Sequence, residues 1–298
     1  MRQFATFACF DWSGQAVARP RGIALAVTRA GAEAPALLAS DSAAPDAGWS
    51  RPDALDWLLK QAANQADMLI GFDFSAGLPW ADQGAYFPQS RTDPADAKAL
   101  WRWIDEACED ESHLSASTLP VRAPLAAHVR HQAGRETITG DAFEPPLGRL
   151  RLTEKRCRAQ KQGNAVSCYN LVGAAQVGKS SFTGMRVLHR LGGVIPVWPF
   201  DPVPDAGPML VEIYTGIAAR AAGLTGPTKV RGPADLDRAL AALGSAPHAP
   251  LPRYDDHSTD AILGSAWLRH AAPDPALWRP PGLSEAVAQQ EGWTFGVR

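Results

Sequence analysis

The chain is short of cysteine and lysine and carries almost no net charge, and these shortages narrow the classes of protein to consider. Its four cysteines include no C-x-x-C pair among 298 residues, and their spacing fits no zinc site. Cys9 lies in an apolar run and is interpreted as a small core residue. The formal net charge of −2 does not indicate a nucleic-acid partner for the whole molecule, although it leaves room for a local basic patch.

Long hydrophobic runs are also absent. No stretch approaches the roughly 18–20 apolar residues that cross a membrane, and the short apolar run before Asp11 lacks the features of a secretory signal peptide. The cysteine usage suits a reducing compartment. We therefore expect a cytoplasmic protein with no membrane partner. Hydrophobic residues at 46% and charged residues at 20% are ordinary for a globular chain with a sizeable core.

The order of the apolar runs predicts an α/β fold with a mixed sheet. Three runs, Phe4–Phe10, Gly22–Thr28 and Ala36–Ala39, follow one another through short connections, which favours antiparallel neighbours. A helix that opens at Pro52 leads to the buried run Met68–Phe74, so this fourth strand is predicted to lie parallel to the first. Three antiparallel strands followed by a helical crossover are how an RNase H-like sheet begins, although periodicity alone also permits other α/β folds.

The middle of the chain is less regular. Residues 78–193 have no clean period for most of their length, and we interpret them as a large insertion or subdomain that covers one side of the site. Two more strands, Val194–Phe200 and Met209–Tyr214, follow it. We expect a single RNase H-like domain over residues 1–298, with helices on both faces of the sheet, including helices at about 216–223, 233–243 and 256–271.

Carboxylates stand where the predicted strands end. Asp11 closes the first strand and Asp73 the fourth, so parallel pairing would bring both to the edge where open α/β sheets bind ligands. Glu212 lies in an apolar strand, where an acid must face solvent, be paired or bind a cation. Asp256 and Asp260 are four residues apart at the start of a helix and so share a face. We take these five acids as the candidate catalytic residues.

Acids this close repel unless a cation lies between them. Magnesium, or manganese, suits such a group because it prefers oxygen ligands and keeps several waters. Asp11, Asp73, Glu212 and Asp260 are the expected metal ligands, and two ions roughly 4 Å apart would suit cleavage of a phosphodiester. Each acid taken alone has a structural interpretation, because an acid after a strand or at a helix start is commonly a turn residue or a cap.

At these residues the sequence is similar to a known family. Four blocks carry the resemblance: CFDWSG (Cys9–Gly14), IGFDFSAGLP (Ile70–Pro79), VEIYTG (Val211–Gly216) and YDDHSTDAILGSAWL (Tyr254–Leu268). They resemble an uncharacterised bacterial and archaeal family of unknown function that is described as predicted nucleases with an RNase H-like fold. The nuclease description is itself an analogy from the fold.

The resemblance implies an RNase H-like fold with Asp11, Asp73, Glu212 and Asp260 at the family's acidic positions. In the junction-resolvase branch of that fold, the last helix carries acids three residues apart. The four-residue spacing here keeps Asp255 open as an alternative to Asp256.

One stretch favours a different chemistry. Residues 173–180 read GAAQVGKS and satisfy G-x-x-x-x-G-K-S/T, the phosphate-binding P-loop. In that interpretation Gly173 and Gly178 shape the loop, Lys179 reaches the phosphates and Ser180 holds magnesium. The context speaks against it, since no strong strand precedes the stretch and Gly184 interrupts the helix after it. The structural alternative is a glycine-rich turn.

A basic run offers a phosphate-binding surface. If it lines the carboxylate edge, it would hold a nucleic acid or another phosphate-bearing ligand; its alternative is a solvated helix face. The run contains Arg149, Arg151, Lys155, Arg156, Arg158 and Lys161.

Histidines offer fewer candidates. His257, beside the paired acids, is a possible proton shuttle or a simple capping residue. His128 and His131 have no third ligand in the sequence, so we interpret them as structural.

Three functions follow as hypotheses. The first is a magnesium-dependent nuclease or phosphodiesterase of unknown substrate. The second is an NTP-binding or phosphotransfer protein that uses Gly173–Ser180. The third is a non-catalytic RNase H-like binding module. The sequence leaves open whether the chain is an enzyme at all, whether a nucleic-acid substrate is DNA or RNA, and the oligomeric state.

Overall fold

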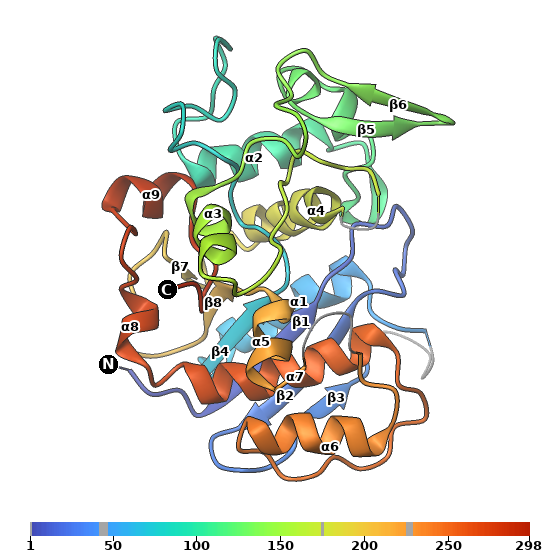
Figure 1. Ribbon diagram of the computed structural model, residues 1–298, viewed down its shortest axis with the longest axis vertical. Helices are drawn as coiled ribbons and strands as arrows, with labels where there is room; N and C mark the ends of the chain where they lie inside the picture. The colour runs from blue at the N-terminus through green and yellow to red at the C-terminus, as the bar shows by residue number, and fades with distance from the viewer. Residues whose placement is uncertain (1, 42–46, 174–175, 225–228) are drawn as a thin grey trace.

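The fold is described from a computed structural model, which places residues 2–41, 47–173, 176–224 and 229–298. Its main element is a six-stranded sheet in the order β3-β2-β1-β4-β8-β7 (Figure 1). The strands are β1 (Thr6–Asp11), β2 (Ala24–Arg29), β3 (Ala36–Leu38), β4 (Met68–Phe72), β7 (Val197–Trp198) and β8 (Met209–Glu212).

The pairing of these strands is mixed. β1, β2 and β3 form an antiparallel meander, whereas β4 lies parallel to β1 and β8 parallel to β4. β7 adds a short parallel edge beside β8. The predicted directions of the first four strands are confirmed, and so is the α/β class with a mixed sheet.

Helices cover both faces of the sheet. One core joins alternate strand residues such as Phe10, Phe72 and Leu210 to helices on the first face. The other joins Cys9, Leu69 and neighbouring positions to helices on the second face. The helices that contribute to the first core are α1 (Arg51–Ala63), α2 (Ala97–Ala107) and α4 (Val177–Arg190); those that contribute to the second are α5 (Thr215–Ala221), α6 (Pro233–Ala242), α7 (Asp256–Ala271) and α8 (Pro275–Trp278).

The connection from β3 to β4 begins with a well-defined helix start. Ser50 accepts a hydrogen bond from the backbone N–H of Asp53, and the Asp53 side chain accepts one from the backbone N–H of Ser50. This capping box and Pro52 in the first turn explain why α1 begins here. The helix then carries the chain across the sheet, so that β4 returns parallel to β1.

The segment predicted as an insertion contributes to the core as well as to the cover. Its helices α2 and α4 pack on the first face of the sheet with α1. A β-hairpin extends from the molecule at the end that lies opposite α6 (Figure 1). The remaining elements are η1 (Ser112–Leu114), η2 (Leu119–Val121), η3 (Leu125–Ala127), β5 (Arg130–Ala133), β6 (Glu136–Thr139), α3 (Leu152–Ala159) and, near the C-terminus, α9 (Glu285–Gln290).

Helix α7 approaches the sheet closely. A Cβ atom on Gly264 would lie 2.3 Å from the Cys9 sulfur, and one on Gly71 would lie 2.7 Å from a methyl carbon of Leu268. Side chains at both glycines would push the helix away from β1 and β4. Their absence brings the first turns of α7 next to the carboxyl ends of these strands. In the described part of the chain, none of the helices has both the length and the apolar character needed to span a membrane.

Candidate functional site

Asp11 and Asp73 lie side by side at the carboxyl ends of β1 and β4. Phe10 pairs with Phe72 in the parallel ladder, and the backbone N–H of Asp73 continues the ladder by donating to the Phe10 carbonyl at 3.1 Å. Because side chains alternate between sheet faces, both aspartates follow Cys9 and Gly71 on the α7 face. The predicted juxtaposition of the two acids on neighbouring parallel strands is confirmed.

Of the acids at the start of α7, Asp260 is the one closest to this pair. Asp260 is largely buried and its charge acts on both strand-end aspartates. Lys229 contacts it at 3.5 Å and contacts Asp256 at 3.6 Å. Asp256 is more exposed and also pairs with Arg231 at 2.9 Å. A lysine therefore occupies the position between these two acids where a cation was expected.

Asp255, the alternative to Asp256, caps the helix. Its carboxylate accepts the backbone N–H of Ser258 at 3.0 Å and the Ser258 hydroxyl at 3.1 Å. This is the ordinary role of an aspartate before the first turn of a helix. The structure thus gives Asp255 a capping role and Asp256 a surface ion pair, and it leaves Asp260 beside the strand ends.

His257 covers Asp11. Its Nδ1 lies 2.6 Å from an Asp11 carboxylate oxygen, while 46% of the histidine side chain remains exposed. Gly22 makes this arrangement possible, because a Cβ there would lie 3.0 Å from both the His257 ring and Ser13. The sequence singles out His257 but gives no sign that it bonds to Asp11.

Thr215 is a functional candidate that sequence reasoning missed. Its hydroxyl donates to Asp73 at 2.6 Å, and its backbone N–H lies 3.4 Å from the other Asp73 oxygen. Thr215 begins α5 just after β8, the strand next to β4, so the sheet order brings it to Asp73. Its only sequence signal is its position after the VEIY run.

Burial makes ionisation of Asp11 and Asp73 less favourable. It raises the pKa of Asp73 to about 7, with a further contribution from the charge of Asp11, and the Thr215 hydrogen bond offsets only part of this. Burial likewise raises the pKa of Asp11 to about 6 despite the hydrogen bond from His257. The pKa of Asp260 is also raised by burial, against the opposing effect of Lys229. A cation bound here would favour the ionised forms.

The donor set suits magnesium better than a metal that needs an all-protein cage. Within the described residues, no group of three or more histidine, cysteine, aspartate or glutamate side chains is close enough to hold a metal ion. Mg²⁺ is commonly bound through one or two carboxylates, and it retains waters in its other positions. Asp11 and Asp73 provide two buried carboxylates in register, with oxygen ligands of the kind that Mg²⁺ prefers.

Glu212 does not join this group, contrary to the sequence-based expectation. It pairs with Phe72 in the ladder and follows Leu210, so it belongs to the opposite set of side-chain positions from Asp73. Arg151 binds its two oxygens at 2.8 and 2.6 Å. The Ala76 N–H and the Thr294 hydroxyl donate to the same carboxylate. With its oxygens occupied in this way, Glu212 is a structural ion-pair partner.

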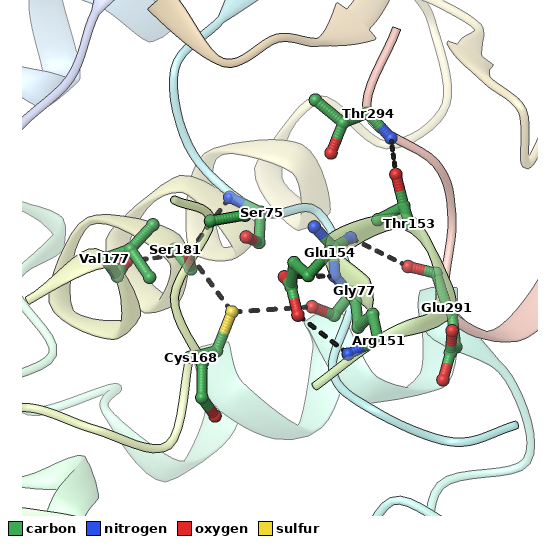
Figure 2. Close-up of polar contacts among 12 residues, drawn as sticks. Ser75, Gly77, Arg151, Thr153, Glu154, Cys168, Val177, Ser181, Glu291 and Thr294 are labelled. Atoms are coloured by element: carbon green, nitrogen blue, oxygen red, sulfur yellow. Dashed lines mark hydrogen bonds and ion pairs between the residues drawn. The ribbon is translucent and has the colours of Figure 1, made fainter. Parts of the chain in front are cut away.

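The Glu212 ion pair belongs to a larger buried network. Arg151 also bonds to Glu154 at 2.9 Å, and Glu291 accepts the Leu152 N–H at 2.8 Å (Figure 2). Burial opposes the charge of Arg151, but the two glutamates raise its pKa well above the ordinary value. The network holds the start of α3 against the C-terminal segment.

Figure 2 also shows how α4 is attached next to this network. The Ser181 hydroxyl accepts the Ser75 N–H at 3.0 Å and lies 3.8 Å from the Cys168 sulfur. Burial raises the pKa of Cys168 to about 12, so this thiol is not a nucleophile at neutral pH. Ser75 follows Asp73 by two residues, which fixes the α4 side of the site.

The described residues in and before the stretch 173–180 do not form the strand and turn that a P-loop needs. Residues 167–173 are irregular apart from an isolated bridge at Asn170, and residues 174–175 lie outside the described part. Gly178 packs against the Cys168 carbonyl, 2.0 Å from where its Cβ would be, so it serves helix packing. The Ser180 hydroxyl donates to the Val177 carbonyl at 2.8 Å. Lys179 and Ser180 line a cavity together with Asp73, and the Lys179 side chain can contact a ligand there.

The basic run does not form the expected phosphate-binding surface. Arg149 is buried against Asp82 at 2.6 Å, and Arg151 is buried against Glu212. Arg156 donates to the carbonyl of Arg298 and Arg158 to that of Ala165. These four arginines serve the fold, which leaves Lys155 and Lys161 as the exposed cations of the run.

Comparisons with known proteins do not extend the description. No protein-family model, no curated protein and no solved structure matches this chain. The assignment of a function therefore depends on the geometry of the site.

Proposed function

We propose that this chain is a divalent-cation-dependent phosphoester hydrolase, a phosphodiesterase or nuclease, built on an RNase H-like fold. The observation that carries the proposal is the buried pair Asp11 and Asp73, in register on neighbouring parallel strands, whose pKa values burial raises to about 6 and about 7. The strand order, with an antiparallel meander followed by parallel β4 and β8, supports the RNase H-like assignment.

Asp11 and Asp73 would hold a Mg²⁺ ion, with Asp260 adding negative charge from α7. A bound ion supplies charge stabilisation at the phosphoryl oxygens and a more acidic water. Thr215 orients Asp73 through its 2.6 Å hydrogen bond.

His257 would protonate the leaving oxygen. The Asp11 hydrogen bond raises the pKa of His257, which favours the protonated form of the imidazole. The exposed side of the ring can then donate a proton, which is the usual role of a histidine in such a position.

Calorimetric titration with MgCl₂ and MnCl₂ at pH 7 tests the proposal. Because burial raises the pKa of Asp73 to about 7 and that of Asp11 to about 6, binding must release protons. The measured enthalpy will therefore differ between two buffers of different ionisation enthalpy. The same ions should support hydrolysis of bis(p-nitrophenyl) phosphate.

Asp73→Asn should abolish both metal binding and hydrolysis, since it removes charge with little change in shape. Asp205→Asn, in an exposed loop, is the matched control and should behave as the wild type. Equal metal binding by Asp73→Asn and the wild type would refute the assignment.

A further inference from the structure

A cavity of about 870 Å³ lies beyond the carboxyl ends of the strands and includes Asp73 in its wall. A second cavity of about 470 Å³ contains Asp260 and Thr215. Asn164 and Tyr214 line both, so the two spaces adjoin where the acids lie. The larger volume is typical of a small-molecule site.

Helix α4 is fixed directly onto the loops that carry the acids. A Cβ on Gly14 would lie 2.2 Å from the carbonyl carbon of Lys179, so the loop after Asp11 touches the helix backbone. The Trp12 indole N–H donates to the Thr183 hydroxyl at 3.1 Å. Together with the contact between Ser75 and Ser181, these bonds keep Lys179 on the wall that it shares with Asp73.

Lys179 is a cation without a counter-charge. It is half-buried and, among the residues that the structure describes, makes no ion pair or hydrogen bond through its side chain. The arginines of the basic run, in contrast, are engaged by the protein itself. A phosphate group is an obvious partner for an unpaired lysine beside an acid pair that favours a metal ion.

His131 supplies an independent sign of a ligand. Only 7% of this residue is exposed, its side chain lines the larger cavity, and it has no hydrogen-bond partner within the described parts of the chain. Its ring nitrogens are not enclosed by the protein, so they are open to the cavity and available to a polar atom of a ligand. His131 comes from the hairpin β5–β6, on a different segment of the chain from Lys179.

We infer that the larger cavity binds a small phosphate ester of about nucleotide size, with Lys179 contacting the phosphate and His131 a polar atom of the organic group. This inference rests on the proposed function, because the ester bond would lie beside Asp73 in the cavity wall. A long nucleic acid needs many phosphate contacts to lysine and arginine, and the cavity wall provides one unpaired lysine.

Binding is tested first with adenosine monophosphate in calorimetry, with and without Mg²⁺. The variant Lys179→Met should weaken binding about tenfold, an effect expected for one charge-assisted contact. Ala133→Trp fills the cavity from the exposed end of β5 and should abolish binding while leaving the Mg²⁺ titration unchanged. Lys155→Met, on the exposed side of α3, is the control and should bind as the wild type.

Hydrolysis separates this inference from the proposed function. Bis(p-nitrophenyl) phosphate and a single-stranded 20-nucleotide DNA serve as substrates. Loss of the small-ester activity in Ala133→Trp supports the inference. Undiminished cleavage of the DNA by Ala133→Trp and Lys179→Met would overturn it while the proposed function stands. Adenosine monophosphate binding that Ala133→Trp blocks, in a protein without metal-dependent hydrolysis, would instead uphold the cavity ligand and refute the hydrolase.

Discussion

Two groups of buried acids lie near the carboxyl ends of the parallel strands β1, β4 and β8, and their charges are balanced in different ways. Glu212 and Glu154 meet Arg151, whose guanidinium bonds to both. Asp11 and Asp73 meet a histidine and a threonine, and their pKa values are raised to about 6 and about 7. The first group has an arginine bonded to both of its carboxylates, whereas the second favours protonation or a cation. This difference separates a structural ion pair from a candidate active site.

The largest expected effect on stability comes from removing the arginine of the first group. Arg151→Met leaves two buried glutamates without their cation, and removal of one partner from a buried ion pair costs roughly 3–5 kcal/mol. Urea unfolding at pH 7 should show this loss in the free energy of unfolding.

Lys155→Met, one turn along the same helix but exposed, provides the comparison and should change stability by less than about 0.5 kcal/mol. The further change Glu212→Gln in the Arg151→Met background should recover part of the loss. Similar stabilities for Arg151→Met and the wild type would mean that the two groups do not differ as described.

Removing an acid of the second group should instead increase the stability of the protein. The folded-state pKa of Asp73 is raised from 3.8 to about 7, so between these pH values the folded protein binds more protons than the unfolded chain. Stability therefore falls as the pH rises through about 7. Asp73→Asn removes this penalty and should stabilise the metal-free protein at pH 8 by on the order of 2–4 kcal/mol, since each pKa unit corresponds to about 1.4 kcal/mol.

Unfolding in urea with a chelator, at pH 5 and pH 8, measures the effect. The stability gain of Asp73→Asn should be much smaller at pH 5 than at pH 8. Saturating Mg²⁺ should stabilise the wild type and not the variant, because binding to the native state alone shifts the equilibrium. If the free energies of unfolding of Asp73→Asn and the wild type differ by the same amount at pH 5 and pH 8, the pKa of Asp73 is not raised.

The contrast between the two acid groups also shows which features could be predicted from the sequence. Asp11 and Asp73 were predictable because each closes an apolar run and the connecting helix makes the strands parallel. The face of Glu212 was not, because the residues on both sides of it are apolar and buried, so no alternation identifies its orientation. A shift of one residue in the register decides whether an acid joins Asp73 or Arg151.

Long-range partners were equally hidden. The pairing of Arg151 with Glu212 spans 61 residues and that of His257 with Asp11 spans 246, and no local pattern encodes either. For the same reason Thr215 escaped notice and His131 was interpreted as structural, since each matters only through what the fold brings next to it. The local signal of Pro52, in contrast, was sufficient to place the start of α1.

The smallest expected effect tests the hydrogen bond between His257 and Asp11. The hydrogen bond and charge of Asp11 raise the pKa of His257, so this histidine should titrate above the ordinary value of 6.5 when followed by NMR of its ring protons. Its contribution to stability is present below the unfolded-state pKa and is lost as the pH rises through the folded-state pKa. Because 46% of the side chain is exposed, the contribution should be below about 1 kcal/mol. Asp11→Asn should lower the pKa of His257, while Asp205→Asn leaves it unchanged. An unshifted His257 in the wild type would show that the histidine does not sense Asp11, and it would remove the proposed proton donor while leaving the metal-binding pair intact.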